Sequence, residues 1–236
     1  MSAARPALIV FCREPIAHQV KTRLIGAITP AAAAALSDAF IRDALSKAVA
    51  ARPSKIVIAA STTEGIGFSK YFRRLARRFG TELIDQGNGS LGMRMAHALA
   101  PFSASGALLI GTDTPTLPAK LLAASLDAVR RHRVVIAPSL DGGYYAIGVR
   151  GPMPPIFNGI RWGSAGVFHS TIDRLERAKI PYKLGPAWYD IDRWPDVMLL
   201  AAHLRLLPQT PRGARSSPCP ATESILKRLG LLRHDR

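Results

Sequence analysis

The fold of this 236-residue chain is decided by the stretch Gly106-Ala107-Leu108-Leu109-Ile110-Gly111-Thr112-Asp113-Thr114-Pro115-Thr116-Leu117-Pro118. Residues 107–110 form a short uncharged run between glycines, which is typical of a strand buried on both faces of a sheet. The prolines that follow predict the start of a helix, with Pro118 in its first turn and Thr116 as a cap. We therefore expect Asp113 just beyond the carboxyl end of a central strand, where open α/β sheets bind ligands. The alternative is that Asp113 only caps the turn.

The composition narrows the class of protein. The chain has 32 Lys and Arg against 16 Asp and Glu, and this excess of positive charge indicates anionic partners such as phosphorylated ligands. The arginines are spread along the chain, so no nucleic acid is expected as a partner. Cys12 and Cys219 lack metal-ligand spacing, which favours a reducing, cytoplasmic location. No apolar stretch is long enough to span a membrane.

The order of strand and helix patterns predicts the architecture. Apolar strands are expected at 7–12, 55–60, 81–85, 134–138, 146–149 and 181–184, and helices at 30–51, 68–79, 91–99, 119–131, 165–179 and 194–207. This alternation predicts an α/β fold with a mostly parallel sheet and helices on both faces. Residues 1–207 are expected to form one nucleotide-binding domain. Residues 208–236 are predicted to form a Pro/Arg-rich tail with one short helix at 224–232.

Two segments suit an anion. Lys21 and Arg23 follow the first strand, a place where α/β folds bind phosphates, but no glycine-rich fingerprint is present. Their side-chain charges would have to make the contacts, unless both are ordinary surface residues. Gly87, Gly89 and Gly92 precede or open a helix, and free backbone N–H groups there suit a phosphate or a sugar hydroxyl. An ordinary loop would look the same.

Carboxylates also recur at strand ends. Asp190 and Asp192 would point the same way along an extended segment and could meet Asp113, although Asp192 could also cap the next helix. Hard cations such as Mg²⁺ or Mn²⁺ prefer ligands of this type together with substrate phosphates. The pattern indicates chemistry on a nucleoside diphosphate or triphosphate.

A tight turn between strands is expected at Asp141-Gly142-Gly143-Tyr144-Tyr145. The two tyrosines could line a pocket or pack in the core. This segment alone does not distinguish a site from a hairpin.

Taken together, these motifs resemble the bacterial DUF2064 family, which consists of glycosyltransferase-like proteins related to 2-phospholactate guanylyltransferase. The resemblance covers about residues 7–206 and implies the GT-A (Rossmann-like) nucleotide-diphospho-sugar transferase fold. It rests on six segments that occur in family order: Val20–Leu24, Leu91–Met95, Ile110–Pro115, Pro138 with Asp141–Tyr145, Ile160–Trp162 and Asp190–Asp192. In one place the chain departs from the family, because His18 and Gln19 stand where a glycine is usual.

The resemblance implies roles for individual residues. It implies that Asp113 and Asp192, with Asp190 beside them, bind the metal, and that Lys21, Arg23, Gly92 and Arg94 bind the nucleotide. It further implies that Asp141, Gly142, Gly143 and Tyr144 face the sugar or the acceptor. In a transferase, a nearby carboxylate would deprotonate the acceptor hydroxyl, and Asp141 is the candidate for this catalytic base.

Three functions are compatible with these residues. The first is a metal-dependent transferase with a nucleotide-sugar donor and an unknown small-molecule acceptor. The second is a nucleotidyltransferase in which an acceptor phosphate attacks a nucleoside triphosphate and releases pyrophosphate. The third is a non-catalytic basic module for nucleic acid or membrane surfaces, which would need exposed aromatics among its cations. Only residues 71–79 approach that pattern.

Overall fold

The computed structural model describes residues 5–63, 65–67, 69–207 and 217–232. Within these residues one seven-stranded sheet forms the centre, in the order β3-β2-β1-β4-β6-β5-β7. The strands are β1 (Ala7–Arg13), β2 (Ile56–Ser61), β3 (Glu82–Asp85), β4 (Ala107–Ile110), β5 (Val134–Pro138), β6 (Tyr144–Val149) and β7 (Tyr182–Leu184). Neighbouring strands are parallel except where β6 pairs with β4 and β5. The predicted α/β class with a mostly parallel sheet is confirmed.

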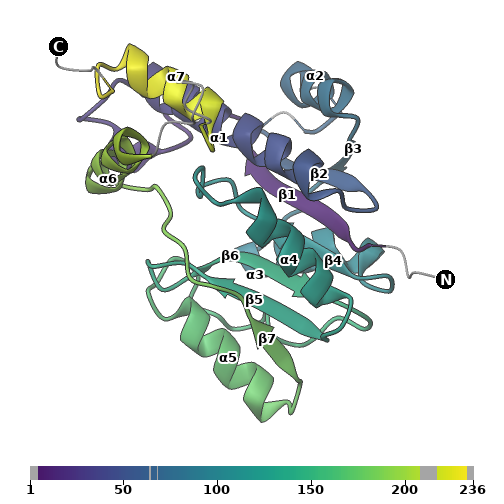
Figure 1. Cartoon of the computed structure of the whole chain (residues 1–236). Helices are drawn as coiled ribbons and strands as arrows, with labels where there is room; N and C mark the ends of the chain where they lie inside the picture. The colour runs from purple at the N-terminus through teal and green to yellow at the C-terminus, as the bar shows by residue number, and fades with distance from the viewer. Residues whose placement is uncertain (1–4, 64, 68, 208–216, 233–236) are drawn as a thin grey trace.

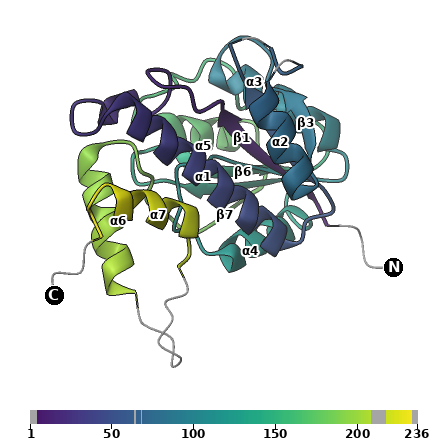
Figure 2. The ribbon, with the colours of Figure 1, turned by 90° about the horizontal axis from the view of Figure 1, so that it is seen from above.

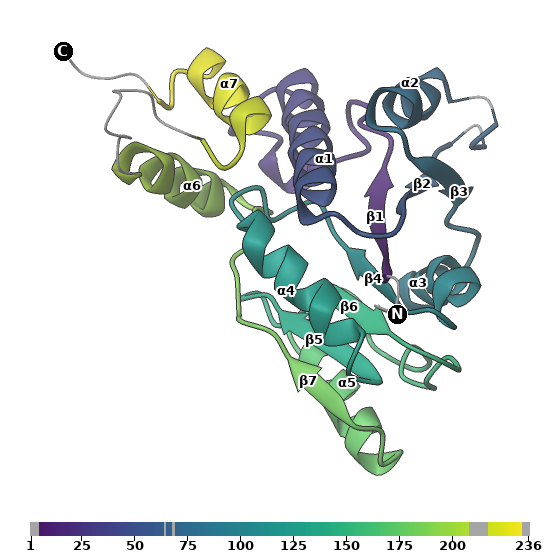
Figure 3. The same ribbon diagram turned by 45° about the vertical axis from the view of Figure 1, so that its right-hand side comes forward.

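Helices cover both faces of the sheet (Figures 1 and 3). On one face, α1 (Pro30–Ala51), α2 (Lys70–Phe79) and α4 (Ala119–Val129) contribute to a core that contains Leu8 and Val10 of β1. On the other face, α3 (Leu91–Leu99) and α5 (Val167–Arg177) join a second core that contains Ile9. Successive residues of a strand point to opposite faces, so the unbroken apolar run of β1 supplies both cores.

Side-chain hydrogen bonds fix the N-terminal ends of two helices. Thr29 caps α1, since its hydroxyl accepts a bond from the Ala32 N–H at 3.2 Å, and Ser90 caps α3 through the Met93 N–H at 3.3 Å. At α4 the expected cap is wrong, because Pro118 is itself the N-cap residue. Thr116 instead accepts a hydrogen bond from Trp188 Nε1 at 3.1 Å, which ties the loop after β4 to the segment before Asp190.

A third core joins the two ends of the described chain. It contains Leu24 of the short 3-10 helix η1 (Thr22–Leu24), together with apolar residues of α1, α6 (Trp194–Leu206) and α7 (Pro220–Arg228). Figures 1 and 2 show α7 beside α1, although the two helices are far apart in sequence. The helix expected at 224–232 thus begins earlier, at Pro220. The division of the chain at residue 207 stays a prediction, and residues 208–216 lie outside the described residues.

One buried carboxylate anchors α7. Asp43 of α1 is 2% exposed, and α7 has no side-chain cap of its own. The Asp43 carboxylate accepts hydrogen bonds from the Ala221 N–H at 3.0 Å, the Thr222 N–H at 2.8 Å and the Thr222 hydroxyl at 2.7 Å. A carboxylate at a helix N-terminus is favourable because it meets unpaired N–H groups and the positive end of the helix dipole.

The basic helix α2 does not have the surface of a nucleic-acid-binding module. Its Phe72 and Leu75 are buried in the core, and Tyr71 and Phe79 are half-buried. Its cations are exposed without exposed aromatic rings between them, so bases would have no surface on which to stack. Among the described residues, no helix combines the length and the apolar character needed to cross a membrane.

Candidate functional site

The predicted acids gather at one edge of the sheet. Asp113 follows β4, and Asp141 lies in the turn between β5 and β6. Asp190 and Asp192 lie between β7 and α6, and the Ile191 N–H donates to the Asp113 carbonyl at 2.9 Å. Because the carboxyl ends of parallel strands share an edge, acids as far apart in the sequence as Asp113 and Asp192 meet here.

Lys21 lies between two of these acids. Its Nζ is 2.7 Å from Asp113 Oδ1 and 2.9 Å from Asp192 Oδ1, and it donates to the Ile191 carbonyl at 2.6 Å. The side chain is only 7% exposed and lies over the ring of Phe40. Burial opposes charge on Lys21, but the two carboxylates outweigh it and raise the pKa of the amine above its usual value. The lysine charge is therefore matched within the protein.

Arg23 is placed differently from Lys21. Its side chain is 55% exposed, and Nη1 contacts Asp192 Oδ2 at 3.3 Å. Burial alone would raise the pKa of Asp192, but Lys21 and then Arg23 hold it below its usual value. Arg23 thus keeps part of its guanidinium available to a ligand.

The loop that contains Lys21 has an unusual backbone conformation at two residues. His18 has a φ of 65° and Lys21 a φ of 48°, both in the left-handed region that favours glycine. His18 lies in the part of the loop where the sequence departs from the family glycine. The left-handed turn is therefore present here without a glycine at this position.

Three carboxylates form a second group. Asp141, Asp190 and Asp192 each place one oxygen within 4.8 Å of the others. Burial raises the pKa of Asp190 to about 6, and the neighbouring charge of Asp141 adds to the effect. Asp113 belongs to the Lys21 contact and not to this group. Of the acids predicted to bind metal, Asp190 and Asp192 therefore lie together with Asp141. Asp113 lies on the other side of the Lys21 amine from Asp192 and contacts that amine. Which of these acids bind an ion stays a prediction.

The turn that carries Asp141 is held from two directions. Asp141 Oδ1 accepts hydrogen bonds from the Gly143 N–H at 2.8 Å and from the Ser139 hydroxyl. Gly142 has a φ of 90°, and a Cβ at this position would lie 2.0 Å from the Ala165 carbonyl oxygen. Only glycine fits so close to another backbone.

Tyr144 begins β6 and meets Trp162 edge to face, with 6.4 Å between the ring centroids.

Gly92 and Arg94 both belong to α3, but they have different surroundings. Gly92 is buried, and a Cβ there would come within 2.5 Å of Trp162 and of the Phe157 carbonyl, so close packing of α3 explains this glycine. Arg94 donates through Nη2 to the side-chain oxygen of Gln86. Sequence reasoning missed Gln86; a polar amide directly after a strand and before a glycine-containing loop was the available signal.

The site is a cleft with two chambers that share a wall. We call the first the basic chamber; it holds about 460 Å³ and is lined by Phe11, Arg13, Gln86 and Arg94. We call the second the acidic chamber; it holds about 450 Å³ and is lined by Asp141, Tyr144, Trp162, Asp190 and Arg193. Both are lined by Arg23, Gly111, Asp113 and Asp192, which form the shared wall.

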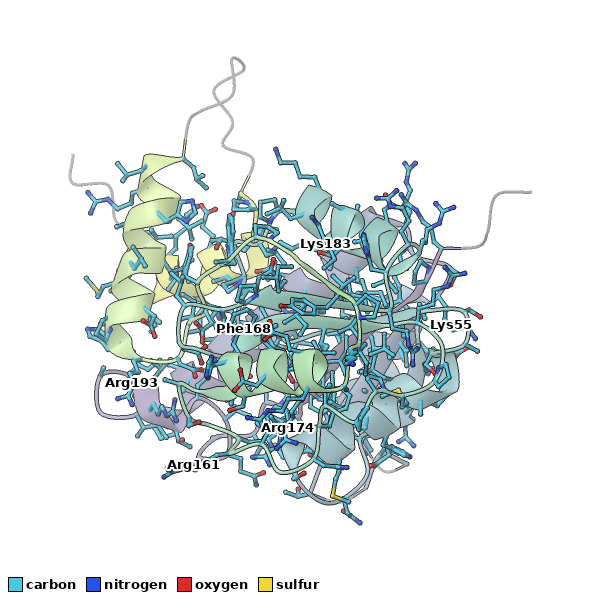
Figure 4. The ribbon with its side chains drawn as sticks, turned by 90° about the horizontal axis from the view of Figure 1, so that it is seen from below. Lys55, Arg161, Phe168, Arg174, Lys183 and Arg193 are labelled. Atoms are coloured by element: carbon cyan, nitrogen blue, oxygen red, sulfur yellow. The ribbon has the colours of Figure 1, made fainter. Side chains whose placement is uncertain are left out.

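The charges differ across that wall. In addition to the wall residues, the basic chamber has Arg13, Arg94 and Lys21, whose charge is matched by Asp113 and Asp192. The acidic chamber has Asp141 and Asp190, with Arg193 as its further cation. In Figure 4, Arg193 and Arg161 lie toward the same side of the molecule, beyond one end of α5. The basic chamber suits a phosphorylated ligand, and the acidic chamber suits a cation or a hydroxyl group that must lose a proton.

The chain matches the profile of the family described as "Uncharacterized protein conserved in bacteria (DUF2064)" over residues 34–164. This range includes Arg94, Asp113 and Asp141. No curated protein sequence matches the chain.

Solved structures extend the likeness. A crystal structure from Desulfovibrio desulfuricans G20, assigned as a nucleotide-diphospho-sugar transferase, is 28% identical with a TM-score of 0.79; the alignment covers 99% of this chain and 98% of that one. The 4-diphosphocytidyl-2C-methyl-D-erythritol synthase of Anaerococcus prevotii DSM 20548 is 10% identical, with 86% and 96% covered and a TM-score of 0.57. The inositol-1-phosphate CTP transferase of T. maritima is 12% identical, with 96% and 98% covered and a TM-score of 0.53. The latter two share the fold.

Proposed function

This chain belongs to the DUF2064 family, and we propose that it is a metal-dependent transferase that uses a nucleotide-diphospho-sugar donor. The two-chambered cleft is its proposed active site. Its likeness to the Desulfovibrio structure supports an enzyme that transfers a glycosyl or nucleotidyl group. One observation carries the proposal: a basic and an acidic chamber meet at a wall formed by Arg23, Asp113 and Asp192. A donor whose diphosphate lies in the basic chamber would place its sugar near this wall.

The basic chamber would hold the nucleoside diphosphate. Arg13, Arg23 and Arg94 line it, and guanidinium groups bind phosphate oxygens with two parallel hydrogen bonds. Lys21 would not be a free phosphate ligand, because its amine is engaged by Asp113 and Asp192. Its proposed role is to keep these two carboxylates charged and in place.

The carboxylates suit a hard divalent cation. Three of them, Asp141, Asp190 and Asp192, bring oxygens within 4.8 Å of one another, and oxygen donors of this kind fit Mg²⁺ or Mn²⁺. Asp190 and Asp192, with Asp141 or Asp113, would hold the ion. When bound, it would supply positive charge against the departing diphosphate.

The acceptor would enter the acidic chamber. Its hydroxyl oxygen would form a bond to the anomeric carbon of the sugar, while the bond from that carbon to the diphosphate oxygen breaks. The hydroxyl proton would pass to Asp141, whose carboxylate is oriented by the Gly143 N–H and Ser139. The nucleoside diphosphate would leave from the basic chamber.

A specific observation favours a second candidate, a nucleotidyltransferase. Arg23 and Arg193 both line the acidic chamber, and they would suit a phosphorylated acceptor. An acceptor phosphate oxygen would then attack the α-phosphate of a nucleoside triphosphate and displace pyrophosphate.

Product analysis tests the proposal. The protein is incubated with nucleotide sugars, or with nucleoside triphosphates, together with Mg²⁺ or Mn²⁺ and a panel of hydroxyl-bearing and phosphorylated acceptors. Free nucleoside diphosphate from nucleotide sugars supports the proposed glycosyl transfer, and pyrophosphate from triphosphates supports the second candidate. Absence of both products, with no nucleotide raising the melting temperature, would contradict the proposal.

A further inference from the structure

Helix α6 is apolar on its solvent side as well as on its buried side. The buried side packs in the third core through Val197, Leu200 and Leu204. On the solvent side, Leu206, Leu199 and Met198 are 82%, 53% and 47% exposed. Pro195 and Ala202 are exposed as well, and residues at these spacings lie along one stripe of a helix. We call this stripe the outer face of α6. A helix that is apolar all round is normally buried, so the outer face calls for a partner.

The position of α6 leaves its outer face accessible. In Figure 2, α6 lies at one edge of the molecule, with α7 beside it. Its N-cap residue, Arg193, lines the acidic chamber together with Asp192, the residue before it. The helix therefore begins at the candidate site and extends away from it.

The free charges of α6 are positive. Arg193 at its start and Arg205 in its last turn are both exposed, and neither forms a salt bridge within the part of the chain that the structure describes. The one acid of the helix, Asp196, is half-buried, and its carboxylate accepts from the Asp192 and Arg193 N–H groups at 3.0 and 2.7 Å. The outer face thus combines aliphatic side chains with cations and has no carboxylate of its own.

A second copy of the chain does not match this face. The strip that α6 offers is about 20 Å long and about 10 Å wide, whereas a stable protein interface buries about 800 Å² on each partner. Two outer faces in contact would also bring arginines together without a carboxylate of α6 between them, and each copy has a formal net charge of +16.

We propose that the outer face of α6 docks on an anionic membrane surface. Met198, Leu199 and Leu206 enter the boundary between headgroups and acyl chains, and Arg193 and Arg205 meet the negative headgroups. The net charge of the whole chain attracts it to the same surface. Because α6 begins at the acidic chamber, this docking brings that chamber beside the bilayer. The inference goes beyond the proposed function and does not depend on it.

Co-sedimentation of the full chain with lipid vesicles tests the docking. The vesicles contain phosphatidylcholine alone or with about one third phosphatidylglycerol, and we expect about tenfold stronger binding to the anionic ones, weakened by added salt. Replacing both Met198→Gln and Leu199→Gln should lower the affinity for anionic vesicles by about tenfold. Val49→Gln is the control, because Val49 is 49% exposed on α1, and it should change binding by less than about twofold.

Arg205→Gln tests the charged part of the proposal. One arginine close to an anionic surface contributes about fivefold in affinity, and this is the loss that we expect. Arg177→Gln is the matched control, because Arg177 is exposed in the last turn of α5 as Arg205 is in the last turn of α6. The control should keep most of the binding.

Several results would overturn the docking proposal. Equal binding to neutral and anionic vesicles, or binding to neither, does so, and so does full binding by the Met198/Leu199 variant. A dimer in analytical ultracentrifugation that this variant abolishes, without vesicle binding, assigns the outer face to a second copy. If the double variant does not fold, Leu206→Gln takes its place, because that side chain is 82% exposed. No nucleotide is present in these measurements, so their failure leaves the proposed function untouched.

Discussion

The two chambers of the cleft share a wall but carry opposite charge. Arg13 and Arg94 add positive charge on one side, while Asp141 and Asp190 add negative charge on the other. Two unit charges 4 Å apart near a protein surface interact by about 4 kcal/mol, which exceeds the strength of most single hydrogen bonds. A diphosphate would therefore bind on the basic side, and the same field would help a hydroxyl on the acidic side to release its proton.

The largest expected effect comes from removing the charge that holds the wall together. Lys21→Met should lower the free energy of unfolding by about 2–3 kcal/mol, because Asp113 and Asp192 lose their shared partner. The loss stays below the ~3–5 kcal/mol of a fully buried pair, since the two acids keep side-chain exposures of 46% and 35%. Urea unfolding measures it.

Lys120→Met, at an exposed position of α4, is the control for this change and should be nearly neutral. If Lys21→Met is equally neutral, water stabilises the Asp113 and Asp192 carboxylates as well as Lys21 does, and Lys21 does not stabilise the wall.

Next in size is a change in the turn between Asp141 and Gly143, two residues that line the acidic chamber. Gly142→Ala forces a Cβ to 2.0 Å from the Ala165 carbonyl at a φ of 90°, and should destabilise the protein by about 2 kcal/mol. Nucleotide affinity should stay the same, because Gly142 does not line the basic chamber. Thermal melting and calorimetry report the two quantities separately.

Gly67→Ala serves as the comparison, because a Cβ there meets nothing within 4 Å. A loss of nucleotide affinity in Gly142→Ala as large as its loss of stability would show that the chambers are not independent.

Arg23→Ala acts on the wall from the basic side. We expect nucleotide binding to weaken by about 1–2 kcal/mol through loss of a charge-assisted hydrogen bond, measured by calorimetry. Stability should change by less than ~1 kcal/mol, since the contact with Asp192 is a largely exposed ion pair. Arg77→Ala is the matched control, and affinity equal to that of this control would remove Arg23 from the site.

An effect of about the same size tells which side holds the metal. Asp190→Asn should reduce the gain in nucleotide affinity on adding Mn²⁺ by about tenfold, because a neutral amide oxygen binds a hard cation less well. Titrations with and without Mn²⁺ measure it, and Asp173→Asn on α5 is the control. An undiminished gain would place the ion away from Asp190.

Asp113→Asn sharpens this test. If Asp113 is a ligand, as the family resemblance implies, the variant loses the Mn²⁺-dependent gain as well. If the gain is kept while Asp190→Asn loses it, the ion belongs to the acidic chamber with Asp141.

Much of the fold follows from the order of the chain. The short uncharged runs at 7–12 and 107–110 are typical of strands buried on both faces, and the helices between the strands favour a mostly parallel sheet. The place of Asp113, Asp190 and Asp192 at one edge follows from the same rule, because each of them comes after a strand.

Contacts between side chains were harder to predict. Nothing in the sequence distinguishes a lysine in solvent from Lys21 between two carboxylates, because that contact joins residues 171 positions apart. The bond between Gln86 and Arg94 depends on how α3 packs beside β3. The packing of Trp162 and Phe157 against Gly92, which accounts for the absence of a side chain there, also joins segments far apart in the sequence, and a nucleotide-binding role for Gly92 stays a prediction.

The anchoring of α7 by Asp43 has a consequence for how the protein is made. The carboxylate and its Thr222 partner are 179 residues apart, so at a synthesis rate of about 5–20 residues per second α1 emerges from the ribosome roughly 10–35 s before α7 exists. During that interval Asp43 and the apolar residues of α1 that α7 will cover remain open to water or to chaperones. Slow codons between residues 43 and 222 should therefore lengthen the aggregation-prone period of the nascent chain, whereas slow codons before residue 43 should not.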